Sequence, residues 1–403
     1  MIQQFFQLPA MSTTQAVSRQ TMLAQARQQL RILMVTPRYF PLMGGVENHV
    51  YQVARRLAHA GADITVLTTD PSRQLPAFEE IAGVKIQRVP AYPPRRDYYY
   101  APDLWKFIQP GKWDIVHLQS YHTLVAPMAM YAAWRAHIPY VVTFHGGGHS
   151  STLRNQIRGL HQALLRPLLA RAAKLIATAR FEIDYYGKRL HLPAEQFTLI
   201  PNGCDIAHQV QSAMIPASDN LNSDNLNSDD LIMSVGRLER YKGHQRLLTA
   251  LPYILQQRPN VHLRIAGHGP YEAELHQLAE KLGVAHRVEI RGIPVTDRNT
   301  MATELAKARL VTLLSDYETH PMAALEALAL KRPVLVTKTS GLQELAEQGL
   351  ARAVALDSTP QEVATAVLDQ MENPLIPCKL ELPTWDDCAR ELLILYRACV
   401  GRF

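Results

Sequence analysis

The sequence has few cysteines, and none is placed as a metal ligand or a disulfide partner would be. Only Cys204, Cys378, Cys388 and Cys399 occur among 403 residues. No two of them form a Cys-x-x-Cys pair or a cluster with histidine at metal-ligand spacing, and three lie within the last 26 residues. We therefore expect reduced thiols in a cytoplasmic protein, and no bound metal.

Long apolar segments are also missing. No run approaches the roughly 18–20 residues that a membrane-spanning helix needs, and the apolar stretch at 124–134 is too short. Residues 1–30 carry neither a basic leader nor a clean apolar core, so we expect no secretory signal. This Gln- and Ser-rich segment predicts a disordered N-terminal extension, unless the chain starts at Met11 or Met22.

The excess of positive charge is too small and too dispersed to indicate nucleic-acid binding. Net charge is +6 and the pI is near 9.1, values compatible with an anionic substrate or an anionic membrane surface. Residues 154–189 hold eight Lys and Arg against two acids, with Leu and Arg at helical spacing. This pattern fits a basic amphipathic face on the inner surface of a membrane. A solvated helix face over a buried leucine stripe fits it equally well.

Short runs of β-branched and aliphatic residues alternate with helix-length segments from residue 31 onward. Such runs are typical of buried parallel strands joined by helical crossovers. In the first half we expect strands at 31–37, 63–69, 84–90, 114–120, 140–146, 174–179 and 197–203, and a helix at 46–60. In the second half we expect strands at 231–237, 261–267, 288–292, 309–315, 333–339 and 351–356, and helices at 243–256, 271–282, 300–307 and 321–329.

A polar, turn-forming repeat separates the two halves. SDNLNSDNLNSDD cannot bury a core, so we interpret 213–230 as a flexible linker. The predicted fold class is α/β, with two Rossmann-like, doubly wound parallel-sheet domains at 31–212 and 231–383. A last amphipathic helix at 386–398 lies in a segment, about 384–403, that we expect to pack back on the first domain. Ligands bind at the carboxyl ends of such strands, which predicts a site between the facing domains.

Two cations follow the first strand of the second half. VGRLERYKG places Arg237 at the end of this strand and Lys242 just before a helix. Both then lie at the carboxyl edge of the sheet, where Arg can hold phosphate oxygens in a bidentate fork and Lys acts as a point charge. Two exposed cations near a turn would give the same pattern, and this alternative stays open.

Two glutamates eight positions apart flank the start of a later helix. Glu318 lies in a loop after a strand, Pro321 suits the first helical turn, and Glu326 lies one to two turns inside the helix. The helix N-terminus presents free N–H groups and a positive dipole end, which suit an anion. Since the helix is rich in Ala and Leu, a carboxylate inside it needs a partner or a ligand, unless Glu326 is solvated.

Glycine-rich turns are present, but none completes a cofactor or nucleophile motif. After Gly267 and Gly269, Glu272 stands where a dinucleotide fingerprint has its third glycine, so we expect no nicotinamide cofactor. The HGGG run at 145–148 is not an esterase oxyanion loop, because the chain has no Gly-x-Ser-x-Gly. The pair at 44–45 lets the backbone approach a ligand closely, or forms a simple loop.

Taken together, seven segments resemble a family 4 glycosyltransferase of the GT-B fold. They are GGVENHV, DIVHLQS, PYVVTFHG, LIPNGCD, SVGRLERYKG, LRIAGHGP and ETHPMAALEALALKRPVLVT, which occur in the family's order and span most of residues 31–346. The resemblance implies a retaining enzyme that moves a sugar from a nucleotide-sugar donor to a glycan, lipid-linked or small-molecule acceptor. It also implies a role in the synthesis of cell-envelope polysaccharide or glycolipid.

The resemblance assigns roles to single residues. Arg237 and Lys242 match the cations on the donor diphosphate, Glu318 the carboxylate at the donor sugar, and Glu326 the carboxylate on the ribose. His145 matches the histidine beside the transferred sugar. The implied catalytic residues are Glu318, His145 and Lys242, and the implied donor-binding residues are Gly44, Gly45, Arg237, Lys242, Ile293, Glu318, His320, Pro321, Met322 and Glu326. The chain departs from the family where Thr319 and His320 follow Glu318 in place of glycine.

No Asp-x-Asp metal motif accompanies this donor site. Fixed cations and a helix N-terminus would then meet the charge that develops on the leaving diphosphate, which predicts metal-independent transfer with closure of the domains over the donor. Two alternatives remain. One is a nucleotide-sugar epimerase, against which the cations and the glutamate pair argue. The other is an inactive, donor-binding partner subunit, which the altered segment after Glu318 allows.

Overall fold

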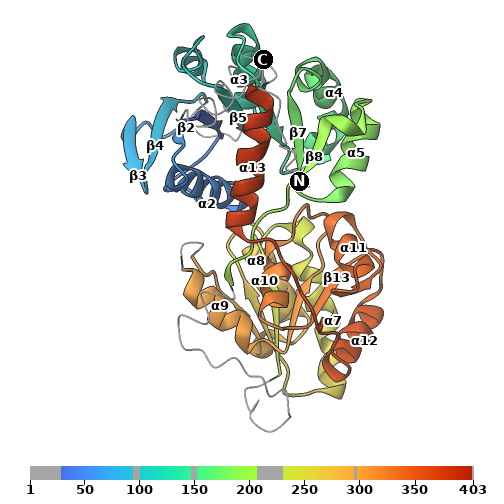
Figure 1. The fold of residues 1–403 in the computed structure, drawn as a ribbon. Helices are drawn as coiled ribbons and strands as arrows, with labels where there is room; N and C mark the ends of the chain where they lie inside the picture. The colour runs from blue at the N-terminus through green and yellow to red at the C-terminus, as the bar shows by residue number, and fades with distance from the viewer. Residues whose placement is uncertain (1–28, 94–99, 147–151, 207–229, 295–296, 402–403) are drawn as a thin grey trace, which may run out of the picture.

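The computed structural model describes residues 29–93, 100–146, 152–206, 230–294 and 297–401. Apart from residues 29, 30 and 230, the predicted N-terminal extension and the predicted linker lie outside these ranges. The described residues form two α/β domains, one below the other in Figure 1, each with helices on both faces of a sheet. The predicted pair of parallel-sheet α/β domains is confirmed.

Within the described residues, the first sheet has eight strands in the order β3-β4-β2-β1-β5-β6-β7-β8. They are β1 Arg31–Val35, β2 Asp63–Asp70, β3 Phe78–Ile81, β4 Val84–Pro90, β5 Ile115–Gln119, β6 Tyr140–Thr143, β7 Lys174–Ala177 and β8 Phe197–Leu199. All neighbours pair in parallel except β3 and β4, which form a hairpin. Sequence analysis missed β3, because its four residues FEEI carry two charges and none of them is fully buried.

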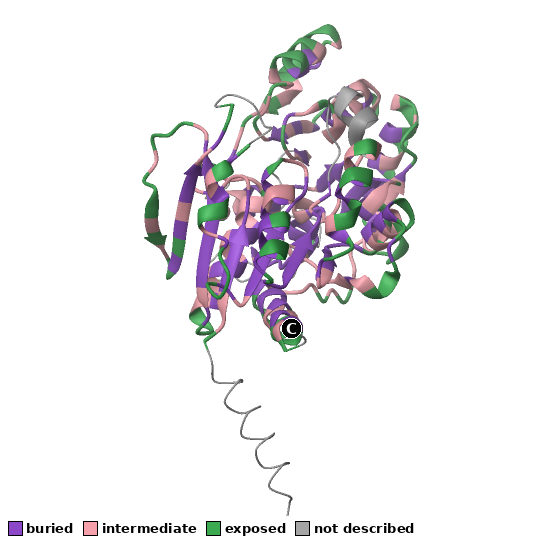
Figure 2. Cartoon of the chain, turned by 90° about the horizontal axis from the view of Figure 1, so that it is seen from above, coloured by how far each residue is buried: buried purple, intermediate pink, exposed green. Residues whose placement is uncertain are grey.

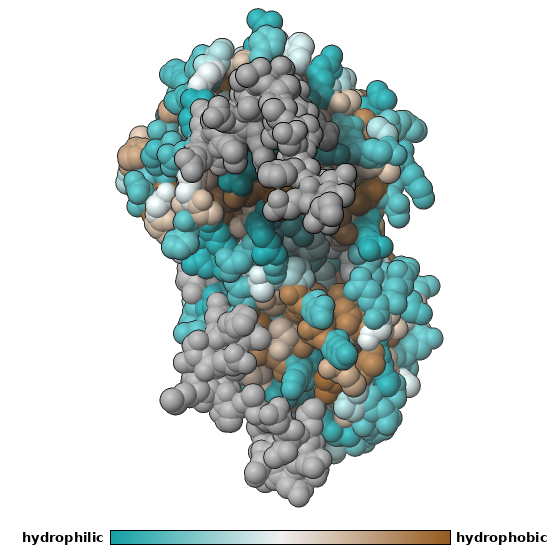
Figure 3. Space-filling model, viewed as in Figure 1, coloured by the Kyte–Doolittle hydropathy of each residue, from teal (hydrophilic) through white to brown (hydrophobic). Residues whose placement is uncertain are grey.

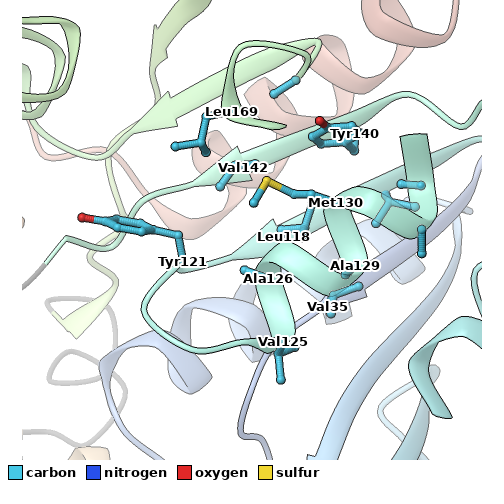
Figure 4. Close-up of a cluster of buried hydrophobic side chains, with 14 of the residues drawn as sticks. Val35, Leu118, Tyr121, Val125, Ala126, Ala129, Met130, Tyr140, Val142 and Leu169 are labelled. Carbon is cyan, nitrogen blue, oxygen red and sulfur yellow. The ribbon is translucent and has the colours of Figure 1, made fainter. Parts of the chain in front are cut away.

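Alternate residues of β1 pack against helices on opposite faces of the sheet. Leu33 and Val35 join a cluster with helix α3, whereas Ile32 and Met34 join a cluster with helix α2. Figure 4 shows the first cluster, with side chains of α3 gathered over strands β5 and β6. The helices of this domain are α2 Gly45–His59, α3 Val125–Arg135, α4 Thr152–Leu169 and α5 Arg180–Leu190, with short turns η1 Pro102–Lys106 and η2 Ala194–Gln196. Seen from above, the strands form a buried layer (Figure 2).

The second sheet, within the same described ranges, has six parallel strands in the order β11-β10-β9-β12-β13-β14. The strands are β9 Leu231–Val235, β10 His262–Ala266, β11 Val288–Ile290, β12 Leu310–Leu313, β13 Val334–Thr337 and β14 Arg352–Val354. The helices are α7 His244–Gln257, α8 Glu272–Lys281, α9 Arg298–Lys307, α10 Met322–Ala329, α11 Ser340–Glu347 and α12 Pro360–Glu372, with turns η3 Arg240–Lys242 and η4 Ala285–Arg287. On the face drawn in Figure 3, hydrophobic residues gather over this domain.

Each sheet has one topological switch point, where the strand order reverses. In the first sheet the chain runs from β1 to one side and then returns to start the other side at β5. In the second sheet the same change separates β9 from β12. Loops that leave neighbouring strands at such a point diverge to opposite faces and open a crevice at the carboxyl edge, where ligands of doubly wound sheets bind.

Helix α13 Trp385–Val400 returns from the second domain and packs against α2 and β5 of the first (Figure 1). Its buried residues complete the cluster on the α2 face of the sheet, and its Tyr396 hydroxyl lies 2.5 Å from Nδ1 of His117. Glycine is required where the chain segments cross, because a Cβ on Gly203 would lie 2.1 Å from the nitrogen of Trp385. Arg56 of α2 bridges Asp205 and Asp386, at 2.5 and 3.0 Å, beside this crossing.

Several elements begin or end at other residues than the sequence predicts. Strand β6 ends at Thr143, because His145 takes a left-handed conformation (φ 44°) that no strand continues. Helix α9 begins at Arg298, since the side chain of Asp297 caps it by accepting from the nitrogen of Thr300. Pro321 is the N-cap of α10, one position before the first turn. The shorter strands leave the predicted site residues in loops at the carboxyl edges.

We predict that α13 is part of the core of the first domain. Replacing Leu392 (1% exposed) by alanine removes buried apolar surface and leaves a cavity, so it should lower the free energy of unfolding by about 2–5 kcal/mol. On the same helix, Ile394 is 62% exposed, and its replacement by alanine should change stability by less than about 0.5 kcal/mol. Urea unfolding of both variants checks this. Equal effects would contradict the assignment.

Candidate functional site

The donor-site residues predicted from the sequence lie at the topological switch points of the two sheets. Arg237 and Lys242 follow β9, and Glu318 follows β12, the neighbour of β9 in the second sheet. In the first domain, Gly44 is the N-cap of α2 and Gly45 is the first residue of this helix, after β1. The loops that sequence analysis assigned to the donor therefore start from the carboxyl edges at which doubly wound sheets bind ligands.

A buried ion pair joins the two loops of the second domain. Nζ of Lys242 lies 2.5 Å from Oε1 of Glu318, and both side chains are about 15% exposed. Ser315 donates a hydrogen bond to the same carboxylate oxygen at 3.1 Å. Burial opposes the charge of Lys242, but the adjacent Glu318 prevails and raises the pKa of the ammonium above its usual value. Lys242 is therefore a fixed cation at neutral pH.

The backbone around this pair is held tightly. A Cβ on Gly243 would lie 1.8 Å from the oxygen of Leu314, and its φ of 75° also favours glycine. His244, the first residue of α7, lies 2.8 Å from the Ser234 hydroxyl and 3.1 Å from the Arg237 carbonyl oxygen. Burial lowers the pKa of His244 to about 4, so this histidine is a neutral spacer. The side chain of Arg237 is 63% exposed and open to a ligand.

Glu326 has a partner that sequence analysis missed. Its side chain is 7% exposed on α10 and forms an ion pair with Arg298, the first residue of α9. Burial raises the pKa of Glu326, and the opposing charge of Arg298 lowers it in part. Arg298 and Glu326 are 28 positions apart, so no local sequence pattern links them. Nearby, Ile293 is 7% exposed and packs in the cluster that contains Leu325.

The first domain contributes a buried histidine loop. Nε2 of His145 lies 2.7 Å from Oε1 of Gln119, and burial lowers the pKa of His145 well below its usual value. The following residue, Gly146, donates its N–H to Glu182 at 3.1 Å. Glu182 also accepts from the nitrogen of Thr178 at 2.7 Å. This buried carboxylate, which sequence analysis missed, holds the turn that carries His145.

The glycine pair lies where α2 begins. Gly44 is in extended conformation, and a Cβ there would lie 2.7 Å from Oε2 of Glu47. For Gly45, no atom of the described chain lies within 4 Å of such a Cβ, so protein packing does not require glycine at this position. Glu47 lies 3.8 Å from Arg38. Burial raises the pKa of Glu47, while Arg38 and the more distant Arg237 of the second domain lower it in part.

The two domains meet through the loops that carry these residues. The hydroxyl of Thr319, next to Glu318, donates to the carbonyl oxygen of Gly146, next to His145. The Glu344 carboxylate accepts from the backbone nitrogens of Arg180 (3.2 Å) and Phe181 (2.5 Å), and so caps α5 from the other domain. The structure thus brings His145, Lys242, Glu318 and His320 to one junction. Pro321 is buried and Met322 half-buried at the start of α10, beside this junction.

No group of three or more His, Cys, Asp or Glu side chains in the described residues is arranged to hold a metal ion. Across the same ranges, each helix is too short or too polar to span a bilayer.

Both halves of the chain match known protein families. The sequence model of Glycosyltransferase Family 4 matches residues 43–208, and that of Glycosyl transferases group 1 matches residues 219–382. The chain is 28% identical to D-inositol 3-phosphate glycosyltransferase of Nocardiopsis dassonvillei, over 89% of this chain and 90% of that protein. It is 27% identical to glycogen synthase of Mycobacterium tuberculosis, over 86% of this chain and 87% of that enzyme.

A solved structure extends the comparison to three dimensions. HepE of Anabaena, in complex with UDP-glucose, has a TM-score of 0.64 at 19% identity, and the match covers 93% of this chain and 99% of HepE. At this identity the likeness shows a shared GT-B fold.

Glu182 should make the stability of the first domain depend on pH. Burial raises its pKa from 4.5 to about 7, so between these values the folded chain binds more protons than the unfolded chain. Stability from this group is therefore present at low pH and is lost as pH rises toward 7, by about 3 kcal/mol in all.

Urea unfolding between pH 5 and 8 measures this dependence. Glu182→Gln should flatten it, whereas Asp184→Asn, which changes an exposed acid on the same helix, should leave it unchanged. Identical pH profiles for the unaltered protein and Glu182→Gln would contradict the assignment.

Proposed function

The chain belongs to the family of group 1 glycosyltransferases, and we propose that it transfers a sugar from a nucleoside-diphosphate sugar with retention and without a metal. The observation that carries the proposal is the buried Lys242–Glu318 pair beside Arg237, where β9 and β12 open their crevice. A carboxylate and two cations at this edge suit the two halves of the donor, a hydroxyl-rich sugar and a diphosphate.

Lys242 and Arg237 suit the negative charge that develops on the leaving diphosphate during transfer. Cleavage of the bond between sugar and phosphate leaves negative charge on the diphosphate. Lys242 is held in place by Glu318, and the exposed Arg237, which pairs with the neighbouring Glu239 at 3.4 Å, would turn toward the phosphates. The N-terminus of α10, near the same loop, adds the positive end of the helix dipole. Charges fixed before the reaction stabilise such a transition state without a metal.

The carboxylates and His145 suit the sugar and the nucleoside. Glu318 and Ser315 present oxygens where the transferred sugar would lie, and neutral His145 offers a hydrogen bond without adding charge. Glu326 would bind the ribose by sharing its carboxylate between Arg298 and the ligand. The family resemblance supports retention, with the acceptor attacking on the face of the leaving group. The complex of HepE with UDP-glucose supports a nucleotide-sugar donor.

The acceptor side faces a surface that suits an anionic membrane. Leu160 and Leu164, one turn apart on α4, are 66% and 69% exposed. Two cations lie nearby: Arg166 of α4 donates to the Leu190 carbonyl oxygen, and Arg189 of α5 donates to the side chain of Gln162. Exposed leucines beside arginines match the headgroup and acyl boundary of anionic lipid. A peripheral contact of this kind would bring a lipid-linked or glycan acceptor to the site.

A thermal-shift panel of UDP-, GDP- and ADP-sugars in EDTA tests the donor site. One donor should raise the melting temperature without metal. Arg237→Ala should abolish this shift, and Lys281→Ala, an exposed control on α8, should keep it. In an activity assay, Arg237→Ala should raise the barrier by about 2–4 kcal/mol, or lower kcat roughly 30- to 1000-fold. A shift that requires Mg²⁺, or survives in Arg237→Ala, would contradict the proposal.

Vesicle flotation tests the membrane surface. The unaltered protein should float with vesicles that contain anionic phosphatidylserine at low salt. Replacing Leu160 and Leu164 together by glutamate should weaken binding about tenfold or more, because it removes apolar contact and adds repulsion. Leu356→Glu, a control on an exposed leucine of the second domain, should bind normally. Absence of flotation, or equal flotation of the double variant, would exclude this surface.

A further inference from the structure

Two buried histidine nitrogens at the domain junction lack hydrogen-bond partners. Among the residues that the structure describes, nothing bonds Nε2 of His49 or Nδ1 of His320, although less than 1 Å² of each atom is accessible. His49 is 2% exposed on the buried face of α2, and His320 lies just before α10 of the other domain. Buried polar atoms are normally hydrogen-bonded. An unpaired histidine nitrogen on each domain, at the same junction, therefore indicates that a ligand bonds there.

Both nitrogens lie beside the predicted reaction centre. The ring of His49 meets the ring of His145 edge-on, with centroids 4.7 Å apart. His320 follows Thr319, whose hydroxyl bonds the carbonyl oxygen of Gly146, and it lies two positions after Glu318. Burial, with His49 as the further cause, lowers the pKa of His320 to about 4, so its imidazole is neutral at pH 7.

The hydrogen bonds of His49 define what its free nitrogen can accept. Nδ1 lies 2.7 Å from Oδ1 of Asn202, an acceptor, so Nδ1 carries the proton. Burial lowers the pKa of His49 to about 4, so the ring is neutral at pH 7 and Nε2 presents a lone pair. A lone pair in a dry site bonds a hydroxyl or an amide N–H. A carboxylate has no hydrogen to offer it, and its charge would lack a partner there.

We propose that Nε2 of His49 and Nδ1 of His320 form a subsite for the hydroxymethyl hydroxyl of the transferred sugar, the group that a uronic acid replaces by a carboxylate, and that this subsite selects neutral sugars over uronic acids. The inference rests on the proposed function and adds a determinant of specificity to it. Since the two histidines come from different domains, the sugar is read from both sides of the junction. A site built to bond a hydroxyl rejects analogues that leave its buried polar atoms unpaired.

Calorimetry with two kinds of probe tests the subsite. The first probe is the nucleoside diphosphate alone, and the second is the matching neutral or uronosyl nucleotide sugar, such as UDP, UDP-glucose and UDP-glucuronate. The unaltered protein should bind the neutral sugar donor at least about tenfold more tightly than the uronosyl donor, a ratio typical of one unpaired buried group.

Variants at both positions should change sugar recognition and spare the nucleotide. His49→Ala and His320→Ala should bind the nucleoside diphosphate within about twofold of the unaltered protein, which also shows that they fold, and the neutral donor about 10- to 100-fold more weakly. His49→Gln, whose amide can replace Nε2, should recover part of the loss. His59→Ala, an exposed histidine at the end of the same helix, should behave as the unaltered protein.

Two results would overturn the subsite while leaving the proposed function intact. One is binding of neutral and uronosyl donors that neither alanine variant changes. The other is an equal loss of affinity for the nucleoside diphosphate and the sugar donor. If the unaltered protein binds no nucleoside diphosphate and no nucleotide sugar, the proposed function fails, and the subsite fails with it.

Discussion

The ion pair between Lys242 and Glu318 is the contact on which the site depends. Burying two charges costs solvation, and the cost is offset only where each charge has a close partner and further hydrogen bonds. Here the 2.5 Å contact and the Ser315 hydroxyl meet that condition. The pair also joins the loops after β9 and β12, so it fixes the width of the crevice between them. A ligand that pairs with the Lys242 ammonium must therefore also bond the Glu318 carboxylate. A donor with an anionic diphosphate and a hydroxyl-rich sugar meets both requirements.

The second constraint is the junction between the domains. The bond from Thr319 to Gly146 and the cap that Glu344 places on α5 hold the His145 loop against the loop of Glu318. An edge-on aromatic pair of Phe181 and Tyr317, with ring centroids 5.6 Å apart, adds to these polar contacts. Interfaces between domains of one chain often open and close around a substrate. Helix α13 starts in the second domain's last segment and ends in the core of the first, so it links the two domains.

The periodic features of this fold could be predicted from the sequence, and the long-range contacts could not. Buried parallel strands leave continuous apolar runs, so their number and order were accessible, as was the loop position of Glu318 between β12 and α10. The polar hairpin strand β3 carries no such signal. Arg298, which pairs with Glu326 from 28 positions away, and Glu182, which holds Gly146 from 36 positions away, depend on packing that no local pattern encodes. His49 looks like one more core position of α2 until the structure shows its unpaired nitrogen.

The most direct test of the central claim is a crystal structure of the chain with a nucleoside-diphosphate sugar, grown without divalent metal. We expect the diphosphate oxygens to lie within hydrogen-bond distance of Nζ of Lys242 and of the Arg237 guanidinium, with the sugar between Glu318 and His145. A donor bound elsewhere, or a diphosphate held at this edge only through a metal ion, would contradict it.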